Sequence, residues 1–573
     1  MIKSLTLYMR RHPALLVALL ASLMFLPWLG LPLFNTKGEP REAIVAVSML
    51  QSGDWVLPVS FGGDIPYKPP FLAWCIALLS WIAGGVSEYT SRLPSALAAI
   101  ALAVATQRWV RRGGASAAAS VVTAMLTVTC FEVWRAASAC RVDMVLTFFM
   151  ASATMELSRY VAGPMRRLPW GAAALMTCAV LTKGPVGMLL PCLVAGVAGL
   201  VSGRSFWPLF RGLALTGLLS LVVPALWYVA AWRSGGDEFV RLAMEENFGR
   251  MTGTMSYGSH EQPFWYPLLT ILWGWVPYTL LALMALTAVS RCRRPVQGAF
   301  KPAALLARLR ALPPLTLYSA VAAAVIVVFF CIPKSKRSVY LLPAYPFLGY
   351  LMMLLVERLR GAAPMRWFVA TMSSLAMLVP VAVWVAAALP ASVAASMSPS
   401  TATQFSAIAS AALSLNGVWA LPLCLVTGLW GWSEIRRRGR RLTEAMLATV
   451  TAILLALSSA ILPPVLSSKS DLPLAIAVSE AAPTGPVYEF HTDRLIRYYT
   501  VNFYIGDRMR LFAREMPTNG WIIIDEPDIE AWREAYGTTY TLTEVTPWHR
   551  RSCDTRRQPH LMRFARRADA PSL

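Results

Sequence analysis

Residues 14–34, ALLVALLASLMFLPWLGLPLF, form a largely apolar run that leads within a few positions into the charged stretch 38–42, GEPRE. About 20 apolar residues are enough for an α-helix to cross the ~30 Å hydrocarbon core of a bilayer. Glu39, Arg41 and Glu42 therefore stand where the chain is expected to leave a membrane. The run predicts a transmembrane helix followed by charged groups at the membrane surface.

The composition of the whole chain is typical of a membrane protein. Of its 573 residues, 56% are hydrophobic and only 14% are charged. Apolar runs of similar length recur along the chain, which indicates a polytopic protein. Lys3, Arg10 and Arg11 precede the first run as in a signal peptide, but no small-residue cleavage site follows it. We therefore expect this helix to be retained.

The net charge of +22 resides largely in short basic loops between the apolar runs. Every second loop is basic, as in the cytoplasmic loops of bacterial inner-membrane proteins, so the charge predicts no nucleic-acid partner. These loops are 108–112, 159–167, 204–211, 291–294, 358–366 and 436–441. The nine cysteines show neither a paired framework nor metal-ligand spacing, and no metal site is predicted.

Placing the basic loops in the cytoplasm predicts thirteen transmembrane helices, with the N-terminus inside and the C-terminus outside. The predicted spans are 13–33, 92–110, 115–134, 142–160, 170–184, 187–203, 210–231, 264–289, 313–332, 338–357, 366–389, 410–432 and 442–463. Residues 71–85 are apolar but short and flanked by proline, which favours an interfacial or re-entrant helix.

A second interfacial helix is predicted directly after Glu39. Pro40 suits the first position of a helix, because its missing N–H would have no helical partner there. One face of this helix would be apolar and would lie along the membrane surface. That face consists of Ala43, Ala46, Val47 and Leu50.

The composition changes after Pro463–Pro464, which divides the chain into a transmembrane domain (1–466) and a small soluble periplasmic α/β domain (467–573). Strand character is predicted for GPVYEFHT, NGWIIIDEP and TYTLTEV, and helix character for DLPLAIAVSEAA and DIEAWREAYG. The basic tail, 550–567, is expected to be solvated or to touch anionic lipid head groups.

The outer loops carry more cations than the positive-inside bias favours, each close to a predicted membrane boundary. These cations are Arg41, Lys68, Arg92, Arg135, Arg141, Lys183, Arg233, Arg241, Arg250, Lys334, Lys336 and Arg337. Snorkelling to lipid phosphate accounts for part of this set. The remainder predicts a cationic pocket for an anionic lipid head group. Because the span interiors are almost free of charge, the pattern does not favour an ion-coupled transporter.

Six stretches resemble, in order, the bacterial branch of the protein O-mannosyltransferase superfamily, which includes the aminoarabinose transferases acting on lipid A. The resemblance covers roughly residues 13–350. Its motifs are GEPREAIVAVSMLQSGDWVLP, IPYKPPFLAW, RAASACRVDMVLTFF, LTKGPVGMLLP, HEQPFWYPLLTILWGWVPY and IPKSKRSVYLLPAYP. The resemblance implies a mainly α, GT-C-type membrane protein: an inverting glycosyltransferase that takes a sugar from a polyprenyl-phosphate carrier on the periplasmic side.

The chain departs from that resemblance at one position. Aminoarabinose transferases typically carry Asp-Glu-x-Arg where this chain has Gly38-Glu39-Pro40-Arg41. The acid usually assigned as catalytic would therefore fall on Gly38, which cannot act as a base. This leaves Glu39 or Asp143 as the catalytic carboxylate and weakens the case for lipid A as the acceptor.

Sugar transfer from such a carrier needs cations at the leaving phosphate and a carboxylate that takes the proton of an acceptor hydroxyl. The candidates for the lipid phosphate or donor are Arg41, Lys68, Arg141, Lys183, Arg250, Lys334, Lys336, Arg337, Tyr340 and Tyr345. The candidates for the acceptor or sugar are Glu42, His260 and Glu261.

The function predicted is transfer of a sugar from undecaprenyl phosphate, or a related polyprenyl phosphate, to lipid A, a cell-envelope glycan or a protein. The enzyme would lie in the bacterial inner membrane, use the lipid-linked sugar as donor substrate and require no further cofactor, with a divalent metal left open. Three alternatives fit the same residues. They are a polymerase or ligase of lipid-linked glycans, a flippase of lipid-linked sugars, and a non-catalytic lipid binder.

Overall fold

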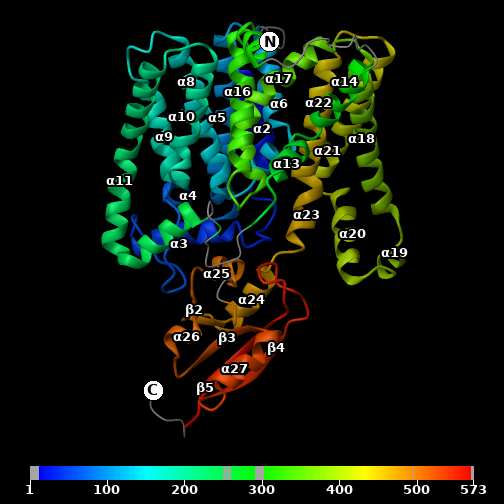
Figure 1. The fold of residues 1–573 in the computed structure, drawn as a ribbon. Helices are drawn as coiled ribbons and strands as arrows, with labels where there is room; N and C mark the ends of the chain where they lie inside the picture. Colours follow the sequence, from blue (N-terminus) through cyan, green and yellow to red (C-terminus); the bar gives the residue numbers. More distant parts are fainter. Residues whose placement is uncertain (1–11, 250–252, 254–259, 291–301, 494–495, 569–573) are drawn as a thin grey trace.

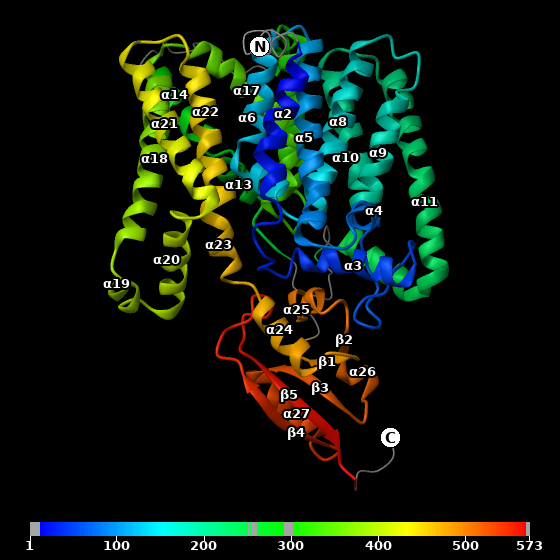
Figure 2. The same cartoon turned by 180° about the vertical axis from the view of Figure 1, so that it is seen from behind.

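A bundle of long apolar helices stands above a smaller α/β unit that contains the end of the chain (Figure 1). This computed structural model describes residues 12–249, 253, 260–290, 302–493 and 496–568. The end of the bundle nearer the α/β unit is called the domain face below. In both views the short helix α3 lies between the bundle and the α/β unit, and α4 lies above it at the lower end of the bundle (Figures 1 and 2).

The first part of the bundle is built from α2 and α5–α11. These helices are α2 (Pro13–Phe25), α5 (Glu88–Arg112), α6 (Ala117–Val128), α7 (Phe131–Ala137), α8 (Val142–Ala162), α9 (Trp170–Lys183), α10 (Val186–Val201) and α11 (Phe206–Met244). Small buried residues, among them Ala99, Ala103 and Ala151, lie along α5 and α8. Such residues let apolar helices approach closely in a membrane.

The second part of the bundle follows the residues after α11. Its helices are α13 (Tyr266–Gly274), α14 (Tyr278–Ser290), α15 (Pro302–Arg310), α16 (Pro314–Cys331), α17 (Tyr345–Arg358), α18 (Ala363–Ala388), α19 (Ala391–Ala395), α20 (Pro399–Ala411), α21 (Leu415–Arg436), α22 (Leu442–Ala456) and α23 (Leu462–Ser467). Helices α18 to α20 form the outer edge of the bundle opposite α11 (Figures 1 and 2).

Within the described residues, 7 helices are long and apolar enough to cross a membrane, or up to 9 if each of two bent pairs counts as one span. This establishes a multi-pass membrane protein, while the predicted number of thirteen spans stays a prediction. Several predicted spans coincide with shorter apolar helices, such as α9 and α10.

Two of the predicted spans each consist of two helices with a sharp bend between them. The helix predicted over 115–134 bends by 70° between α6 and α7, and the one predicted over 264–289 bends by 103° between α13 and α14. Pro277 at the second bend has no N–H to continue a helix. The backbone groups at the two bends pair with each other, because the Phe131 N–H donates to the Val276 carbonyl at 2.9 Å. Backbone groups exposed by a broken helix need such partners at membrane depth.

The helix predicted directly after Glu39 is confirmed as α3 (Pro40–Ser52), with Pro40 in its first turn. Ala43 and Ala46 are fully buried, whereas Val47 and Leu50 are half-buried. The segment predicted at 71–85 forms α4 (Phe71–Ala83). With 13 residues it is about 20 Å long, too short to cross the hydrocarbon core.

The α/β unit contains a five-stranded sheet in the order β2-β1-β3-β5-β4. Its elements are α24 (Leu472–Ala481), β1 (Val487–Phe490), α25 (Tyr499–Tyr504), β2 (Met509–Leu511), α26 (Phe512–Glu515), β3 (Asn519–Asp525), α27 (Ile529–Tyr536), β4 (Tyr540–Pro547) and β5 (Pro559–Arg566). Strand β1 runs parallel to β2 and β3, and β5 runs antiparallel to β3 and β4. Ile522, Ile523 and Ile524 of β3 are all buried, because both faces of the central strand are covered.

The sequence correctly places β1, β3 and β4, but the basic tail is not simply a solvated extension. Residues 559–566 form β5, and Leu561, Met562 and Phe564 are buried in the sheet. The arginine residues around these positions hide the strand pattern.

The α/β unit docks on α3 and the loop after it through polar contacts. Asp507 accepts hydrogen bonds from the Ser48 hydroxyl at 2.8 Å and from the Phe61 N–H at 3.0 Å. Asp64 forms ion pairs with Arg497 and Arg514, each at 3.4 Å. These contacts join residues more than 400 positions apart and fix the first loop against the end of the chain.

Candidate functional site

An ion pair connects the first turn of α8 with the end of α9 at the domain face. Asp143 Oδ1 accepts a hydrogen bond from Lys183 Nζ at 2.6 Å. Within the described residues the other oxygen, Oδ2, accepts no hydrogen bond. Lys183 also lies over the ring of Tyr340, 4.4 Å from its centroid. Gly184, at φ +97°, ends α9, so that Lys183 is the last residue of this helix.

A second pair joins α3 to the loop before α4. Lys68 Nζ forms an ion pair with Glu42 Oε1, and Arg41 lies 3.4 Å from the same oxygen. The Tyr67 ring lies near both cations, with its centroid 5.9 Å from the Arg41 guanidinium and 5.8 Å from Lys68 Nζ. The two prolines after Lys68 restrict the backbone that carries it.

Glu39 forms a buried, two-pronged ion pair with Arg92. The Arg92 Nε and Nη2 donate to Oε1 at 2.8 Å and Oε2 at 3.0 Å, and the Cys140 N–H adds a bond to Oε1 at 2.9 Å. Burial raises the pKa of Glu39, but Arg92 and the other donors lower it below its ordinary value. Glu39 therefore joins α3, α5 and the segment before α8 as a fixed anion.

Arg141 stands beside Gly38 with its guanidinium in the space that a side chain at position 38 would need. Within the described residues, Arg141 has no carboxylate in ion-pair range. The neighbouring cation, Arg337, has a pKa lowered by burial and by the positive charge of Arg141. Two arginines close together, the first with no carboxylate in ion-pair range among the described residues, form a site suited to phosphate.

Two cavities flank the start of α8. The first, of about 200 Å³, has Asp143 and Lys183 at one end and apolar walls that include Phe329, Phe330 and Leu189. The second, of about 400 Å³, is lined by Glu39, Arg92, Arg135 and Arg141 on its polar side. The predicted charged groups thus converge on one end of the bundle but divide between two chambers.

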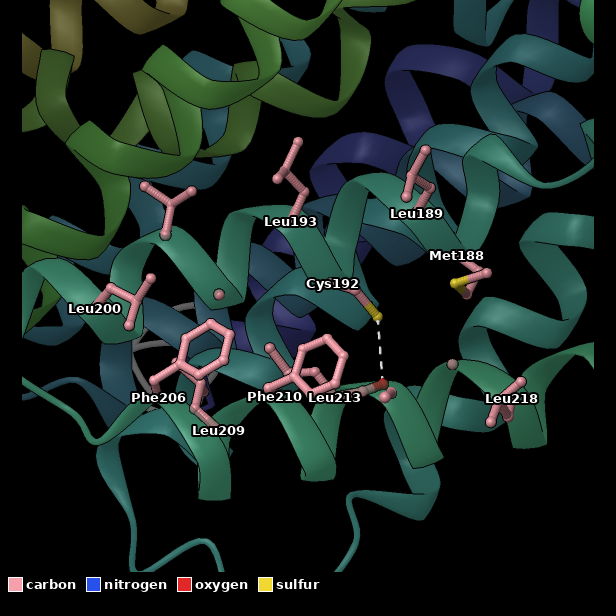
Figure 3. Close-up of a pocket in the computed structure, with 14 residues that line it drawn as sticks. Met188, Leu189, Cys192, Leu193, Leu200, Phe206, Leu209, Phe210, Leu213 and Leu218 are labelled. Carbon is pink, nitrogen blue, oxygen red and sulfur yellow. Dashed lines mark hydrogen bonds between the residues drawn. The ribbon is translucent and has the colours of Figure 1, made fainter.

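A third cavity, of about 540 Å³, is an apolar groove between α10 and α11. Figure 3 shows aliphatic and aromatic side chains from both helices, such as Leu193 and Phe210, along this groove. Leu189 lines both the groove and the cavity that contains Asp143 and Lys183. The apolar groove therefore meets the charged site at this residue.

Known proteins resemble this chain both in sequence and in fold. A family model described as dolichyl-phosphate-mannose-protein mannosyltransferase matches residues 67–228. An undecaprenyl phosphate-alpha-4-amino-4-deoxy-L-arabinose arabinosyl transferase of Edwardsiella ictaluri is 26% identical over 327 residues, covering 56% of this chain and 55% of that protein. The crystal structure of ArnT from Cupriavidus metallidurans bound to undecaprenyl phosphate superimposes with a TM-score of 0.70 at 21% identity, covering 98% and 99% of the two chains. In part of its sequence the chain is similar to the protein O-mannosyltransferase superfamily, and its fold is that of the ArnT structure.

This likeness to the O-mannosyltransferase superfamily is strongest in the first part of the chain. An uncharacterized protein of Aquifex aeolicus is 27% identical over 318 residues, 55% of this chain and 58% of that protein. The matched segments span little more than half the length of such curated relatives. The likeness in fold to ArnT, by contrast, extends over nearly the whole chain.

Several residues predicted from the superfamily motifs lie apart from the cluster at Asp143. Lys336 Nζ donates to the Gln262 carbonyl at 2.9 Å, and Lys334 lies beside Gly253 and Glu261. Tyr345 is buried and stacks on Trp275 with ring centroids 5.2 Å apart, so it is part of the packed core. His260 and Glu261 are exposed next to this loop, and Arg250 lies outside the described residues.

Sequence reasoning missed the partners that hold the site together. Arg92 was recognised as an outer cation but not as the partner of Glu39. Tyr67 precedes Lys68 directly, and an aromatic ring next to a cation was the available signal. Tyr499 of α25 packs on Phe61 with ring centroids 5.4 Å apart, which brings the α/β unit to the loop that carries the site. Nothing in the sequence relates these distant positions.

Proposed function

We propose that this protein is an inner-membrane glycosyltransferase that moves a sugar from undecaprenyl phosphate, or a related polyprenyl phosphate, to an acceptor on the periplasmic side. The relatives named as undecaprenyl-phosphate-dependent transferases support this proposal. The observation that carries it is the meeting of an apolar groove with Lys183 and Asp143 at Leu189. In this proposal the domain face is periplasmic, residues 1–466 form the transferase domain and residues 467–573 a periplasmic domain.

The donor lipid places its prenyl chain along the groove between α10 and α11. Its phosphate then lies at the charged end of the adjoining cavity, within reach of Lys183. As the glycosidic bond breaks, negative charge grows on that phosphate, and fixed cations stabilise the transition state more than the ground state. Lys68 and Arg337 are the further cations that serve this role.

Asp143 is the carboxylate best placed to take the acceptor proton. Only one of its oxygens is committed to Lys183, and the side chain lines a cavity. Glu39, by contrast, has both oxygens bound by Arg92, which leaves no room for a substrate hydroxyl. We therefore assign proton transfer to Asp143 and an anchoring role to Glu39. The acceptor hydroxyl attacks the anomeric carbon from the side opposite the phosphate, which inverts that centre.

The anionic part of the acceptor occupies the second chamber, and its reacting hydroxyl reaches across the start of α8 to Asp143. Arg135 and Arg141 line this chamber together with Phe131 and Trp134. Cations beside aromatic rings suit an amphipathic acceptor with an anionic group, such as lipid A or another envelope glycolipid. A glycan or protein acceptor, and a polymerase or ligase reaction, use the same chemistry.

One observation favours a second candidate, a protein that binds or moves lipid-linked sugars without transferring them. Gly38 leaves Arg141 without the carboxylate that the aminoarabinose transferases typically carry at this position, and Asp143 is ion-paired. A binder or flippase needs the cationic pocket but no base.

Transfer of a radiolabelled sugar from its polyprenyl phosphate in proteoliposomes, with envelope extract as acceptor, tests the proposal. We expect transfer by the wild type and a fall of about 10²–10⁴ in rate for Asp143→Asn. Glu156→Gln, which removes an exposed carboxylate at the other end of α8, is the matched control and should retain the wild-type rate. Movement of labelled lipid across the bilayer without any glycosylated product supports the flippase and contradicts the transferase.

A further inference from the structure

A buried imidazole in the α/β unit lies among carboxylates and has no hydrogen-bond partner on either ring nitrogen. The side chains of His491, Glu489 and Asp525 are each 0% exposed, and that of Asp528 is 3% exposed. Both nitrogens of His491 and the Oδ2 atom of Asp525 are buried without a hydrogen bond. Leaving buried polar atoms unpaired is costly, so such a group points to a missing partner.

Two carboxylate oxygens lie at similar distances from one nitrogen of the imidazole. Asp525 Oδ2 lies 3.7 Å and Asp528 Oδ2 lies 3.8 Å from His491 Nδ1, too far for good hydrogen bonds. Two ligand atoms on one tetrahedral zinc ion lie about 3.4 Å apart, given metal–ligand distances of about 2.0–2.2 Å. The three atoms therefore need only small shifts to contact a common cation.

The remaining oxygens of the two aspartates are held by side chains around them. Asp525 Oδ1 accepts hydrogen bonds from the Tyr498 hydroxyl at 2.6 Å and the Thr555 hydroxyl at 3.1 Å. Asp528 Oδ1 accepts one from the Thr492 hydroxyl at 2.5 Å, and Asp528 Oδ2, the oxygen 3.8 Å from His491 Nδ1, accepts one from Arg557 Nη1 at 3.1 Å. The carboxylates are thus fixed with an oxygen of each turned to the imidazole, as in metal sites with oriented ligands.

On its other side, the imidazole faces Glu489. His491 Nε2 lies 3.4 Å from Glu489 Oε2. A metal-bound histidine usually donates its second N–H to such a carboxylate, which fixes the ring and strengthens the ligand. The other oxygen of Glu489 lies 3.3 Å from Arg497 Nε, which balances its charge.

The position in the sheet is a common one for ligand sites. His491 directly follows β1, and Asp525 ends β3, its parallel neighbour. Ligands in sheets of this kind bind at the carboxyl ends of parallel strands. Asp528 lies in the turn that follows β3.

We propose that His491 Nδ1, Asp525 Oδ2 and Asp528 Oδ2 bind one divalent transition-metal cation of the Zn²⁺ class, with Glu489 accepting a hydrogen bond from Nε2. An imidazole nitrogen favours such ions over Mg²⁺ and Ca²⁺, and two carboxylates neutralise the charge. Water completes the coordination.

This site also bears on how the α/β unit docks. Arg497, the partner of Glu489, lies 3.4 Å from Asp64 of the first loop as well. A cation that orders His491 and Glu489 therefore also orders the arginine that joins the α/β unit to the membrane part. The alternative to a bound metal ion is a proton on His491. Burial lowers the pKa of His491, but Asp528 and Glu489 raise it to about 9.

Metal content decides between the two occupants. The full-length protein in detergent is stripped with a chelator, dialysed against limiting Zn²⁺ and analysed for bound metal by mass spectrometry and for thermal unfolding. We expect one Zn²⁺ per chain and a higher unfolding temperature with Zn²⁺, with no comparable effect of Mg²⁺. Asp525→Asn and His491→Gln should each weaken Zn²⁺ binding at least about tenfold.

Cys553→Ser is the matched control, because Cys553 belongs to a separate buried group with Asp471 and Asp554. This variant should retain the bound Zn²⁺. If His491→Gln fails to fold, the absorption bands of Co²⁺ bound to the wild type and to Asp525→Asn give the same comparison. Wild type that binds no Zn²⁺, or that loses it only in Cys553→Ser, overturns the proposal. Neither readout depends on glycosyl transfer.

Discussion

Lys183 Nζ lies 2.6 Å from Asp143 Oδ1, although the two residues belong to different helices and are 40 positions apart. The lysine therefore both orients the proposed base and faces the proposed phosphate. We expect Lys183→Met, which keeps the length of the side chain without its charge, to lower the transfer rate about 10²–10³-fold. Arg159→Met, on an exposed arginine near the far end of α8, is the control in the proteoliposome assay. Equal rates for the two variants would remove Lys183 from the mechanism.

Gly38→Asp should supply Arg141 with a carboxylate partner. A side chain at position 38 meets only the far end of the Arg141 side chain, which is flexible enough to move. We expect Gly38→Asp to unfold at a higher temperature than Gly38→Ala, because the added anion relieves the repulsion between Arg141 and Arg337. It should also weaken binding of undecaprenyl phosphate if Arg141 takes part in phosphate binding. Identical unfolding temperatures would show that Arg141 is already neutralised.

The Glu39–Arg92 pair should matter for stability. Removing one member of a buried ion pair leaves the other charged group unpaired, which typically costs about 3–5 kcal/mol. We expect Glu39→Gln and Arg92→Gln each to lower the free energy of unfolding strongly, and the double variant to lose less than the sum. The exposed pair Glu156–Arg159 provides the control, for which both losses should be small. Glu39→Gln protein that is stable but inactive would restore Glu39 as the base.

The contact of Asp507 with Ser48 and Phe61 should hold the α/β unit on α3. Asp507→Ala leaves buried donors without partners, at a cost of about 1–3 kcal/mol. We expect faster proteolysis between α23 and α24 in this variant, measured as the release of a fragment containing the sheet. Glu534→Ala, an exposed position on α27, is the control. Unchanged cleavage would mean that the apolar contacts alone hold the unit in place.

Stability should depend on pH through Asp554. Burial and the charge of Asp471 raise the pKa of Asp554 from 3.8 to about 7, while Lys37 lowers it; Thr500 and Cys553 are its other neighbours. Between these values the folded protein keeps a proton that the unfolded chain releases. The contribution of this group therefore falls as the pH rises, by up to about 1.4 kcal/mol per pH unit.

Asp554→Asn tests this pH dependence, because an amide resembles the protonated acid. The N–H and the hydroxyl of Thr500 both donate to the Asp554 carboxyl, and the amide keeps one oxygen that can accept from them. We expect the variant to gain stability relative to wild type between about pH 5 and about pH 8, measured by thermal unfolding in detergent. Parallel curves for the two proteins would contradict the raised pKa.

The charged residues of the site whose position depends only on their neighbours in the sequence could be predicted. Glu39, Arg41, Lys68, Asp143 and Lys183 stand at helix ends or beside proline, and such positions place charged groups at a membrane boundary. The choice between the two carboxylates could not be predicted. It depends on Arg92, which lies 53 positions from Glu39 and reaches it only because α5 packs on α2 and α4, and α4 in turn packs on α3.

The α/β unit shows the same limit. Strand β3 could be predicted from its apolar run, because both faces of the strand are buried. Strand β5 could not be predicted, since arginine residues interrupt the alternation of apolar and polar residues along it. The group around His491 was missed because its members come from three places that become neighbours only in the folded sheet.

The docking of the sheet on α3 has a consequence for biosynthesis. Ser48 and Asp507 are 459 positions apart, so α3 leaves the ribosome long before its partner exists. The first loop therefore stays only partly covered until the last hundred or so residues have been translated. A chain cut short by a late nonsense codon would keep every membrane helix, yet its earliest loop would never acquire its final packing.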